Sequence, residues 1–284
     1  RPPSEADSIL LQVTLGCSHN RCAFCGAYKD KRFAIKDPET VRRDLTFAAR
    51  YMTRQRRVFL CDGDALILPQ QRLLELLREI HAHLPWVTRV GTYANAKSLK
   101  RKSLQELAEL REHGLGIIYM GLESGDEATL AAMDKGQSVT EIVAQGRKAR
   151  EAGLKLSVTV LLGLAGPEGS LRHAEATGRA LTEMAPDQIG ALTLMLVPGT
   201  PLHTAWREGR FEILSPAEAL RELRVMLEHT RLSRGLFLAN HASNHLALKV
   251  RLSERSDDKA TALARIDQAL AGRVSLRPER LRGL

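Results

Sequence analysis

Six short apolar segments, each followed by a helical pattern, constrain the fold of this chain most strongly. The segments are rich in Val, Ile and Leu and cover residues 9–15, 57–61, 87–93, 116–122, 154–162 and 189–197. Start signals for helices stand between them, with Pro38 after Asp37 and capping boxes that begin at Ser103 and Ser138. Strands that are apolar almost throughout are buried on both faces, which predicts an α/β fold with a parallel sheet covered by helices.

Two architectures accommodate six such units, an open doubly wound sheet and a partial (β/α)₆ barrel. Both place functional residues at the carboxyl ends of the strands. Residues 198–284 have a different pattern, in which helices are predicted near 215–232 and 256–271 with a short apolar run at 235–239. We therefore expect two domains, residues 1–197 and an α-rich C-terminal extension over residues 198–284.

Polar, glycine and cysteine residues gather where the predicted strands end. Since the carboxyl ends of parallel strands meet at one edge of a sheet, we expect these residues to form one site. In chain order they are Cys17, Cys22, Cys25, Asp62, Gly63, Asp64, Tyr93, Asn95, Glu123 and Gly163.

The stretch LGCSHNRCAFCG, residues 15–26, holds three of the four cysteines of the chain. Four cysteines, three of them clustered, do not suit a disulfide framework. Three thiolates in one loop can instead ligate three irons of a [4Fe–4S] cluster and leave the fourth iron open to a substrate or cofactor. Four thiolates would close a structural site, whereas catalysis needs the open position.

With this loop in place, the sequence resembles the radical S-adenosylmethionine (radical SAM) superfamily over about residues 10–197. The loop of that family has three and then two residues between its cysteines, with an aromatic residue before the third. Here Phe24 stands in the aromatic position, but the first gap holds four residues, Ser18 to Arg21. The resemblance implies a partial (β/α)₆ TIM-like barrel that binds one [4Fe–4S] cluster and S-adenosylmethionine (SAM).

The resemblance also implies roles for individual residues. Cys17, Cys22 and Cys25 would ligate the cluster. Gly163 would let the backbone approach the adenine, which Phe24 also borders.

Two more roles concern the strand-end carboxylates. Asp62-Gly63-Asp64 stands where the family often has Gly-Gly-Glu, at the contact with the methionyl amine. Which group of this turn makes the contact stays open, because both flanking residues differ. Glu123 resembles the residue that accepts hydrogen bonds from the ribose hydroxyls.

The activity implied is reductive cleavage of SAM to methionine and a 5′-deoxyadenosyl radical, which removes hydrogen from an unidentified substrate. An external one-electron donor such as flavodoxin or ferredoxin would supply the electron. The protein would position the reactants and exclude water. Tyr93, Asn95, His241 and Asn244 are weaker candidates for substrate contact. The alternatives are a strand-end aromatic for Tyr93, a turn for Asn95 and loop structure for His241 and Asn244. Cys61 is expected to be a small core residue at the end of a buried strand.

The chain carries a net charge of +9, with basic runs at residues 54–57, 97–102 and 277–282. This charge favours an anionic small-molecule substrate, or a tRNA or peptide, but it also suits solvated helix faces. Aromatic residues make up only 4% of the chain, which argues against a platform for stacking single-stranded nucleic acid. No stretch reaches ~18 consecutive apolar residues, so we expect no membrane span and a cytoplasmic protein.

Zinc is the main alternative ligand of the cysteine loop. Cys17, His19, Cys22 and Cys25 together form the Cys₃His set of a structural zinc site. With the basic charge, this set would indicate a zinc-stabilised RNA-binding protein without redox chemistry. The position of the loop among the other strand-end residues favours the iron–sulfur interpretation.

Overall fold

The computed structural model describes residues 2–283 and divides into two compact units. Unit 1 comprises Arg1–Asn20, Ala27–Met120 and Gln145–Leu156. Unit 2 comprises Arg21–Gly26, Gly121–Ala144 and Ser157–Leu284. The cysteine loop contributes to both, with Cys17 in unit 1 and Cys22 and Cys25 in unit 2.

Unit 1 begins the alternation of strands and helices. Its strands are β1 (Ile9–Gln12), β2 (Thr14–Leu15), β3 (Ala34–Ile35), β4 (Arg57–Cys61) and β5 (Arg89–Ala94). Its helices are α1 (Pro38–Tyr51), α2 (Gln70–His83), α3 (Ala96–Lys100) and α4 (Leu104–Glu112), with 3₁₀ turns at Pro3–Glu5 and Ala65–Ile67. Three elements have residues in both units, namely β6 (Leu115–Glu123), α6 (Val139–Glu151) and β7 (Lys155–Leu162).

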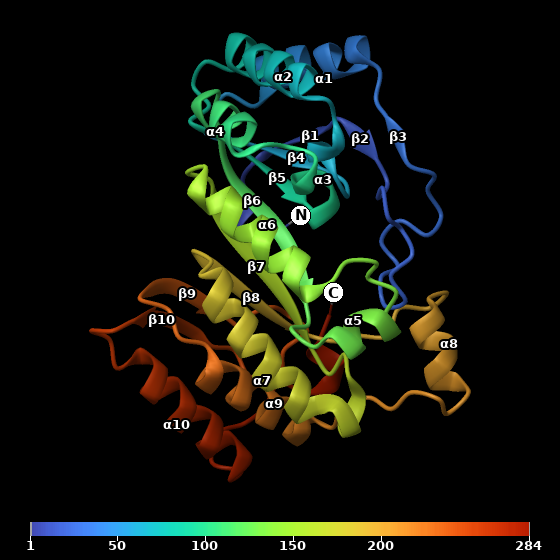
Figure 1. The fold of residues 1–284 in the computed structure, drawn as a ribbon, viewed down its shortest axis with the longest axis vertical. Coiled ribbons are helices and arrows are strands. Elements are labelled where there is room, and N and C mark those ends of the chain that lie inside the picture. The colour runs from blue at the N-terminus through green and yellow to red at the C-terminus, as the bar shows by residue number, and fades with distance from the viewer. Residues whose placement is uncertain (1, 284) are drawn as a thin grey trace. The chain divides into compact units, whose positions relative to one another are not determined.

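Unit 2 continues the alternation and adds the C-terminal segment (Figure 1). Its further strands are β8 (Gln188–Thr193), β9 (Arg234–Leu238) and β10 (Lys249–Ser253). Its helices are α5 (Glu127–Ala132), α7 (Gly166–Met184), α8 (Pro201–Arg207), α9 (Pro216–His229) and α10 (Asp258–Leu270), with a 3₁₀ turn at Glu279–Leu281.

Eight strands form one sheet in the order β1-β4-β5-β6-β7-β8-β9-β10. Parallel registers place Leu11 beside Leu60 and Val160 beside Ala191. Within this sheet, as far as the structure describes its residues, β10 is the one strand that runs antiparallel to its neighbour, β9. The α/β fold class and the partial-barrel type predicted from the sequence are confirmed, since the sheet of the described residues is mostly parallel and its order does not close on itself.

The predicted strands differ from the observed ones mainly at their ends. The segment 9–15 splits into β1 and β2, because β2 leaves the main sheet to pair with β3. The segment 189–197 stops being a strand at Thr193. The C-terminal segment, expected to be α-rich, also contributes β9 and β10 to the sheet.

An aromatic cluster fills the interior of unit 1. The ring of Phe59 meets Tyr93 and Tyr119 edge-on, with centroids 5.0 and 5.6 Å apart. The fully buried carboxylate of Glu5 lies next to Tyr119. It accepts hydrogen bonds from the Tyr119 hydroxyl at 2.6 Å and from Arg89. The charge of this carboxylate is tolerated in the interior because donors surround it.

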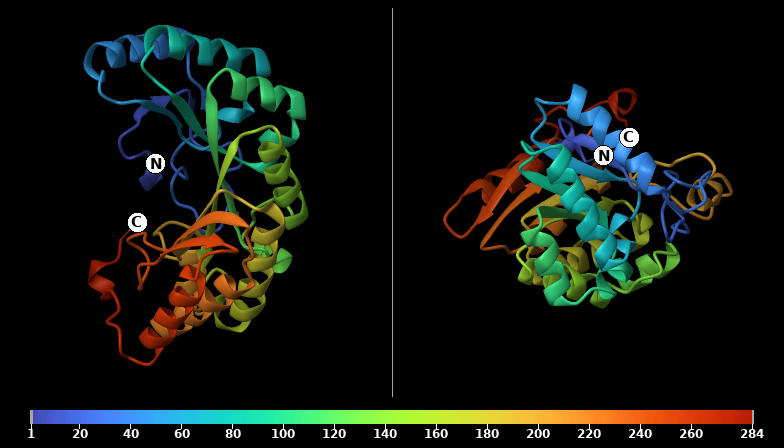
Figure 2. Two further views of the ribbon diagram at one scale, coloured as in Figure 1. Left: turned by 90° about the vertical axis from the view of Figure 1, so that its left-hand side faces the viewer. Right: turned by 90° about the horizontal axis from the view of Figure 1, so that it is seen from above.

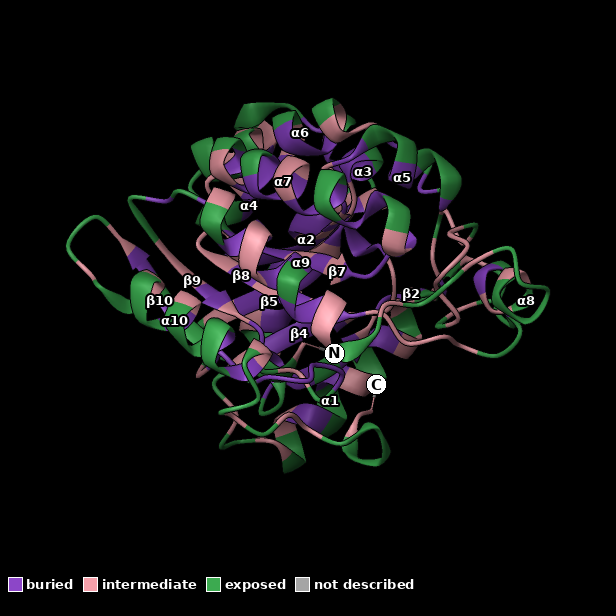
Figure 3. Ribbon diagram, turned by 90° about the horizontal axis from the view of Figure 1, so that it is seen from below, coloured by how far each residue is buried: buried purple, intermediate pink, exposed green. Residues whose placement is uncertain are grey.

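The helices of unit 2 pack tightly against one another. Helix α9 contacts α7 on one side and α10 on the other (Figure 2). At the contact with α7, a Cβ on Gly178 would stand 2.8 Å from the carbonyl oxygen of Met226, so only glycine permits this approach. The helices bury one face and expose the other, whereas most strand residues are buried (Figure 3). No helix among the described residues is long and apolar enough to cross a membrane.

Candidate functional site

The turn after β4 is joined to the start of the cysteine loop in unit 1. The amide of Gly63 donates a hydrogen bond to the carbonyl oxygen of Gly16 at 2.9 Å. A Cβ on Gly63 would stand 2.7 Å from the Cβ of Cys17, closer than real Cβ atoms approach one another. Residue 63 must therefore be glycine for the chain of Cys17 to lie against the turn.

The carboxylate of Asp62 also stabilises the contact between this turn and the start of the cysteine loop. Its Oδ2 accepts hydrogen bonds from the amide of Gly16 at 2.9 Å and from Nε2 of Gln12 at 3.0 Å. Asp62 has a φ of +69°, a left-handed conformation that aspartate adopts more readily than most residues. Its backbone conformation and its side chain thus both serve the contact with the cysteine loop.

Asp64 is fully buried and also binds the cysteine loop. Its Oδ2 accepts hydrogen bonds from the Ser18 hydroxyl and from Nδ2 of Asn95, both at 2.7 Å. Burial raises the pKa of this carboxyl, and the hydrogen bonds from Ser18 and Asn95 oppose the shift. Asn95 also caps α3 through the amide of Ser98, so this predicted residue is engaged on both sides of its amide group.

Tyr93, Cys61 and the unpredicted Tyr28 lie next to this turn. Tyr93 and Cys61 pack against the aromatic cluster of unit 1. Burial raises the pKa of Tyr93 to about 12, and the nearby Cys61 adds to the shift. Burial also raises the pKa of Tyr28, with Asp62, Tyr93, Cys61 and Cys17 as further causes. Tyr28 therefore lies close to the first cysteine.

The second half of the cysteine loop is anchored within unit 2. The amide of Ala23 donates to the carbonyl of Met133 at 2.8 Å, and the carbonyl of Ala23 accepts from Leu202 at 2.9 Å. Phe24 packs against an apolar cluster that includes Leu164, the residue directly after Gly163. Phe24 and the residue next to Gly163 thus belong to one cluster.

Glu123 ends β6 in a left-handed conformation, with a φ of +63°. Its Oε1 pairs with Nζ of Lys135 at 3.0 Å, and the two side chains are only 12% and 11% exposed. A Cβ on residue 121 would stand 2.0 Å from Oε1, so Gly121 leaves room for the carboxylate to fold back along the strand. Lys135 was not predicted as a site residue.

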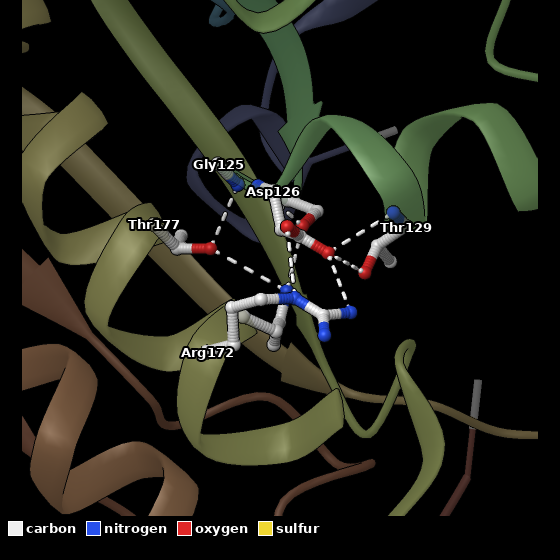
Figure 4. A network of polar contacts seen from close by, with 7 residues as sticks. Gly125, Asp126, Thr129, Arg172 and Thr177 are labelled. Atoms are coloured by element: carbon white, nitrogen blue, oxygen red, sulfur yellow. Dashed lines mark hydrogen bonds and ion pairs between the residues drawn. The ribbon is translucent and has the colours of Figure 1, made fainter. Parts of the chain in front are cut away.

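The residues after Glu123 are fixed by side chains of α7 (Figure 4). The amide of Gly125 donates to Oγ1 of Thr177 at 2.8 Å. The carboxylate of Asp126 accepts hydrogen bonds from two side chains. Nε of Arg172 donates to Oδ1 at 3.1 Å, and the hydroxyl of Thr129 donates to Oδ2 at 2.6 Å. Burial raises the pKa of Asp126, but the hydrogen bonds from Thr129 and Arg172 outweigh it and lower the pKa below its usual value.

Gly163 follows β7 with a φ of +85°. Its amide donates to Oε1 of Glu222 at 2.6 Å, and Glu222 lies fully buried on α9. Sequence analysis did not single out Glu222, although an acidic residue among Ala219, Leu223 and Met226 on one helix face was a signal.

The segment His241–His245 is fixed to the end of β8. Oδ1 of the buried Asn244 accepts from the Thr193 hydroxyl at 2.9 Å, and its Nδ2 donates to the Ala191 carbonyl at 2.8 Å. Arg277 donates to the carbonyl oxygens of His241 and Asn244. The amide of Asn244 is thus engaged with β8, while His241 is partly exposed.

Comparison with known proteins decides the family. The family model of the radical SAM superfamily matches residues 11–175, more than half of the chain. The chain belongs to the radical SAM superfamily. Radical SAM enzymes use a [4Fe–4S] cluster and SAM, and the cysteine motif that binds such a cluster is present here as CX₄CX₂C. The chain is therefore an enzyme of SAM-dependent radical chemistry.

Similar proteins confirm the radical SAM fold but leave the reaction open. An uncharacterized protein of Methanocaldococcus jannaschii, MJ0486, is 22% identical over 233 residues, 78% of this chain and 71% of that protein. Methylornithine synthase (PylB) superposes with a TM-score of 0.56 at 18% identity and covers 79% of this chain. Coproporphyrinogen III oxidase (HemN) from Escherichia coli gives 0.55 at 15% identity and covers 78%. This chain spans only 63% and 51% of those two structures.

Proposed function

We propose that this radical SAM protein binds one [4Fe–4S] cluster through Cys17, Cys22 and Cys25 and cleaves SAM reductively. The donor set is chemically that of such a cluster, because none of the three cysteines forms a disulfide and each is partly exposed. Within the described residues these side chains are not gathered around one metal position, so cluster binding has to draw them together. The observation that carries the proposal is the contact of the Asp62-Gly63-Asp64 turn with Gly16 to Ser18. It fixes the first cysteine at the carboxyl end of β4, where sites of such sheets lie.

The same turn offers backbone groups to the methionyl amine of SAM. The Asp64 carboxylate is buried, and its Oδ2 accepts from Ser18 and Asn95, whereas its Oδ1 has no hydrogen-bond partner among the described residues. We assign the amine to this turn, with the backbone carbonyls and Oδ1 of Asp64 as its acceptors. Through Oδ2, Asp64 also keeps the loop in place.

In this proposal, residues of unit 2 bind the nucleoside part of SAM. Glu123 accepts the ribose hydroxyls, with Lys135 orienting its carboxylate. Phe24 and the backbone of Gly163 border the adenine, a role supported by the packing of Phe24 against Leu164. The positive φ of Gly163 exposes its backbone without a Cβ in the way.

The cluster that Cys17, Cys22 and Cys25 would hold would supply the one-electron reduction that cleaves SAM to methionine and a 5′-deoxyadenosyl radical, which would abstract hydrogen from the substrate. The residues of this chain hold the two halves of SAM and exclude water. The cluster receives its electron from an external donor such as flavodoxin or ferredoxin.

Residues 198–284 form the substrate entrance in this proposal. Tyr93 and His241 are candidates for substrate contact. Asn95 instead holds Asp64 and α3 with its amide group, and the buried Asn244 holds its segment against β8. The net charge of +9 favours an anionic small molecule over a neutral one. A tRNA substrate would instead show binding that weakens steeply with salt.

Anaerobic reconstitution with iron and sulfide tests the proposal. We expect iron and sulfide in the ratio of one [4Fe–4S] cluster, and formation of 5′-deoxyadenosine and methionine when dithionite and SAM are added. A colourless protein that holds stoichiometric zinc and leaves SAM intact would overturn the proposal in favour of a zinc-stabilised protein.

Two cysteine variants form a matched pair. Cys22→Ala removes a proposed ligand, so bound iron and SAM cleavage are both lost. Cys61→Ala removes a thiol that packs against the aromatic cluster, so the iron content stays at the wild-type value. Equal loss of iron in both variants would contradict the assignment of the ligands.

A further inference from the structure

A buried polar network in unit 2 joins the turn after Glu123 to the turn at Gly163. At its centre the imidazole of His173, on α7, is fully buried. Its Nδ1 lies 2.7 Å from the hydroxyl of Ser124, the residue directly after Glu123. Its Nε2 lies 3.1 Å from the carbonyl of Leu161 and 3.4 Å from Oε1 of Glu222.

The carboxylate of Glu222 is the other centre of the network. It accepts from the amide of Gly163 at 2.6 Å and from the hydroxyl of Ser170 at 2.5 Å. The groups nearest Nε2 of His173 are both acceptors, so this nitrogen carries a hydrogen, which it donates to the carbonyl of Leu161, while the carboxylate of Glu222 lies beside it. Two hydrogen-bond donors and the adjacent imidazole N–H therefore surround one fully buried carboxylate, which compensates for its removal from water.

The turn at Glu123 needs this support because its backbone is in an uncommon conformation, whereas Gly163 adopts a positive φ freely. Glu123 and Gly163 have φ values of +63° and +85°. A left-handed conformation at a non-glycine residue persists only where its surroundings hold it. The network supplies partners on each side, with Ser124 next to the first turn and Glu222 bonded to the second.

We propose that Glu222, acting with His173, is a positioning residue for the nucleoside half of SAM. It rests on the proposed function, in which Glu123 binds the ribose and Gly163 borders the adenine. Glu222 comes from α9 in the C-terminal segment, so that segment takes part in cofactor binding besides shaping the substrate entrance. Glu222 itself touches neither SAM nor the cluster.

The variant Glu222→Gln tests the proposal in the reconstituted holoenzyme. A carboxamide has one acceptor oxygen, so its NH₂ group faces one of the two donors, Gly163 or Ser170. We expect the dissociation constant for SAM to rise about tenfold or more, as for the loss of a hydrogen bond to a charged group. The iron content should stay unchanged, because the hydrogen bonds of Glu222 go to Gly163 and Ser170 and not to a proposed ligand of the cluster. Glu228→Gln is the matched control, since Glu228 lies exposed on the same helix.

Two fragments of SAM distinguish a positioning role from a general loss of structure. Binding of 5′-deoxyadenosine should weaken in Glu222→Gln, whereas free methionine should still perturb the electron paramagnetic resonance spectrum of the reduced cluster. Equal weakening for both fragments, or unchanged affinity for SAM, would overturn the inference. If the wild-type protein with a full cluster binds no SAM, the proposed function itself fails, and the inference with it.

Ser170→Ala provides a milder variant should Glu222→Gln not fold. It removes one donor to Glu222 and leaves the contact with Gly163 in place. A severalfold weaker binding of 5′-deoxyadenosine, again with methionine binding retained, supports the inference. Wild-type affinity for 5′-deoxyadenosine in this variant contradicts it.

Discussion

The amide of Gly63 donates a hydrogen bond to the carbonyl oxygen of Gly16, 2.9 Å away, and so fastens the turn after β4 to the residue before Cys17. The two residues are far apart in the sequence. Their contact brings the cysteine loop to the carboxyl end of a parallel strand. In this account, that position makes the loop a catalytic site.

Gly63→Ala should disturb the first cysteine. The new Cβ would stand 2.7 Å from the Cβ of Cys17, so the loop must move, at a cost of about 1–3 kcal/mol as for other overpacked sites. We expect less iron after reconstitution and desalting. Gly190→Ala is the control, because its Cβ would meet only Leu192 at an ordinary 3.7 Å. Wild-type iron content in Gly63→Ala would contradict the proposed role of the turn.

Glu123→Gln should weaken SAM binding without loss of the cluster. The variant loses the ion pair with Lys135 and the charge that accepts from the ribose hydroxyls. A hydrogen bond to a charged group contributes about 1.5–3 kcal/mol, so KM for SAM should rise about tenfold or more in an assay of 5′-deoxyadenosine formation. Glu112→Gln, an exposed change at the end of α4, should leave KM unaltered. If both variants have the same KM for SAM, Glu123 does not bind the ribose.

Asn244→Ala should lower stability. The substitution leaves the Thr193 hydroxyl and the Ala191 carbonyl without their buried partner, at about 1–3 kcal/mol for each. Chemical denaturation would measure the loss, with the exposed Asn240→Ala as a control of the same residue type. If the variant keeps wild-type stability but loses turnover, Asn244 instead contacts the substrate.

Stability should fall in mild acid because of His245. Burial lowers the pKa of this imidazole, and Arg282 adds to the shift. Below about pH 6.5, the unfolded chain therefore binds a proton that the folded chain resists, and the free energy of unfolding decreases with falling pH. Melting curves at pH 8 and pH 5.5 should show this loss, and His245→Gln should reduce it. An identical pH dependence in the variant would contradict the assignment.

The strands of the sheet differ in how well the sequence reveals them. Those from β4 to β7 are short, mostly apolar runs buried on both faces, so local pattern is sufficient. In β1 and β8 buried residues alternate with more exposed ones, and their apolar residues still indicate a strand. β10 alternates exposed and buried residues over only Lys249–Ser253 and pairs at the edge of the sheet, so its pattern resembles that of a loop. β2 and β3 have two residues each and exist only through their pairing.

The residues of the site also differ in how well the sequence reveals them, because some are marked by the local sequence and others only by partners that are distant in the sequence. The cysteine spacing and the strand-end residues are local and could be predicted. The partners of Asp62, by contrast, include Gly16, which is 46 positions away. Glu222 is 59 positions from Gly163, so only the fold brings them together. A carboxylate on the apolar face of a predicted helix is the one sequence signal of such a network.

Mössbauer spectroscopy of the holoenzyme reconstituted with ⁵⁷Fe, before and after addition of SAM, tests the central claim most directly. If three cysteines leave one iron open and SAM binds there, about a quarter of the iron absorption changes its parameters on addition of SAM. The same change should occur in His19→Ala. A spectrum that SAM leaves unaltered, or one that responds to SAM only after His19 is removed, would show that a protein ligand closes the fourth iron and would contradict the account.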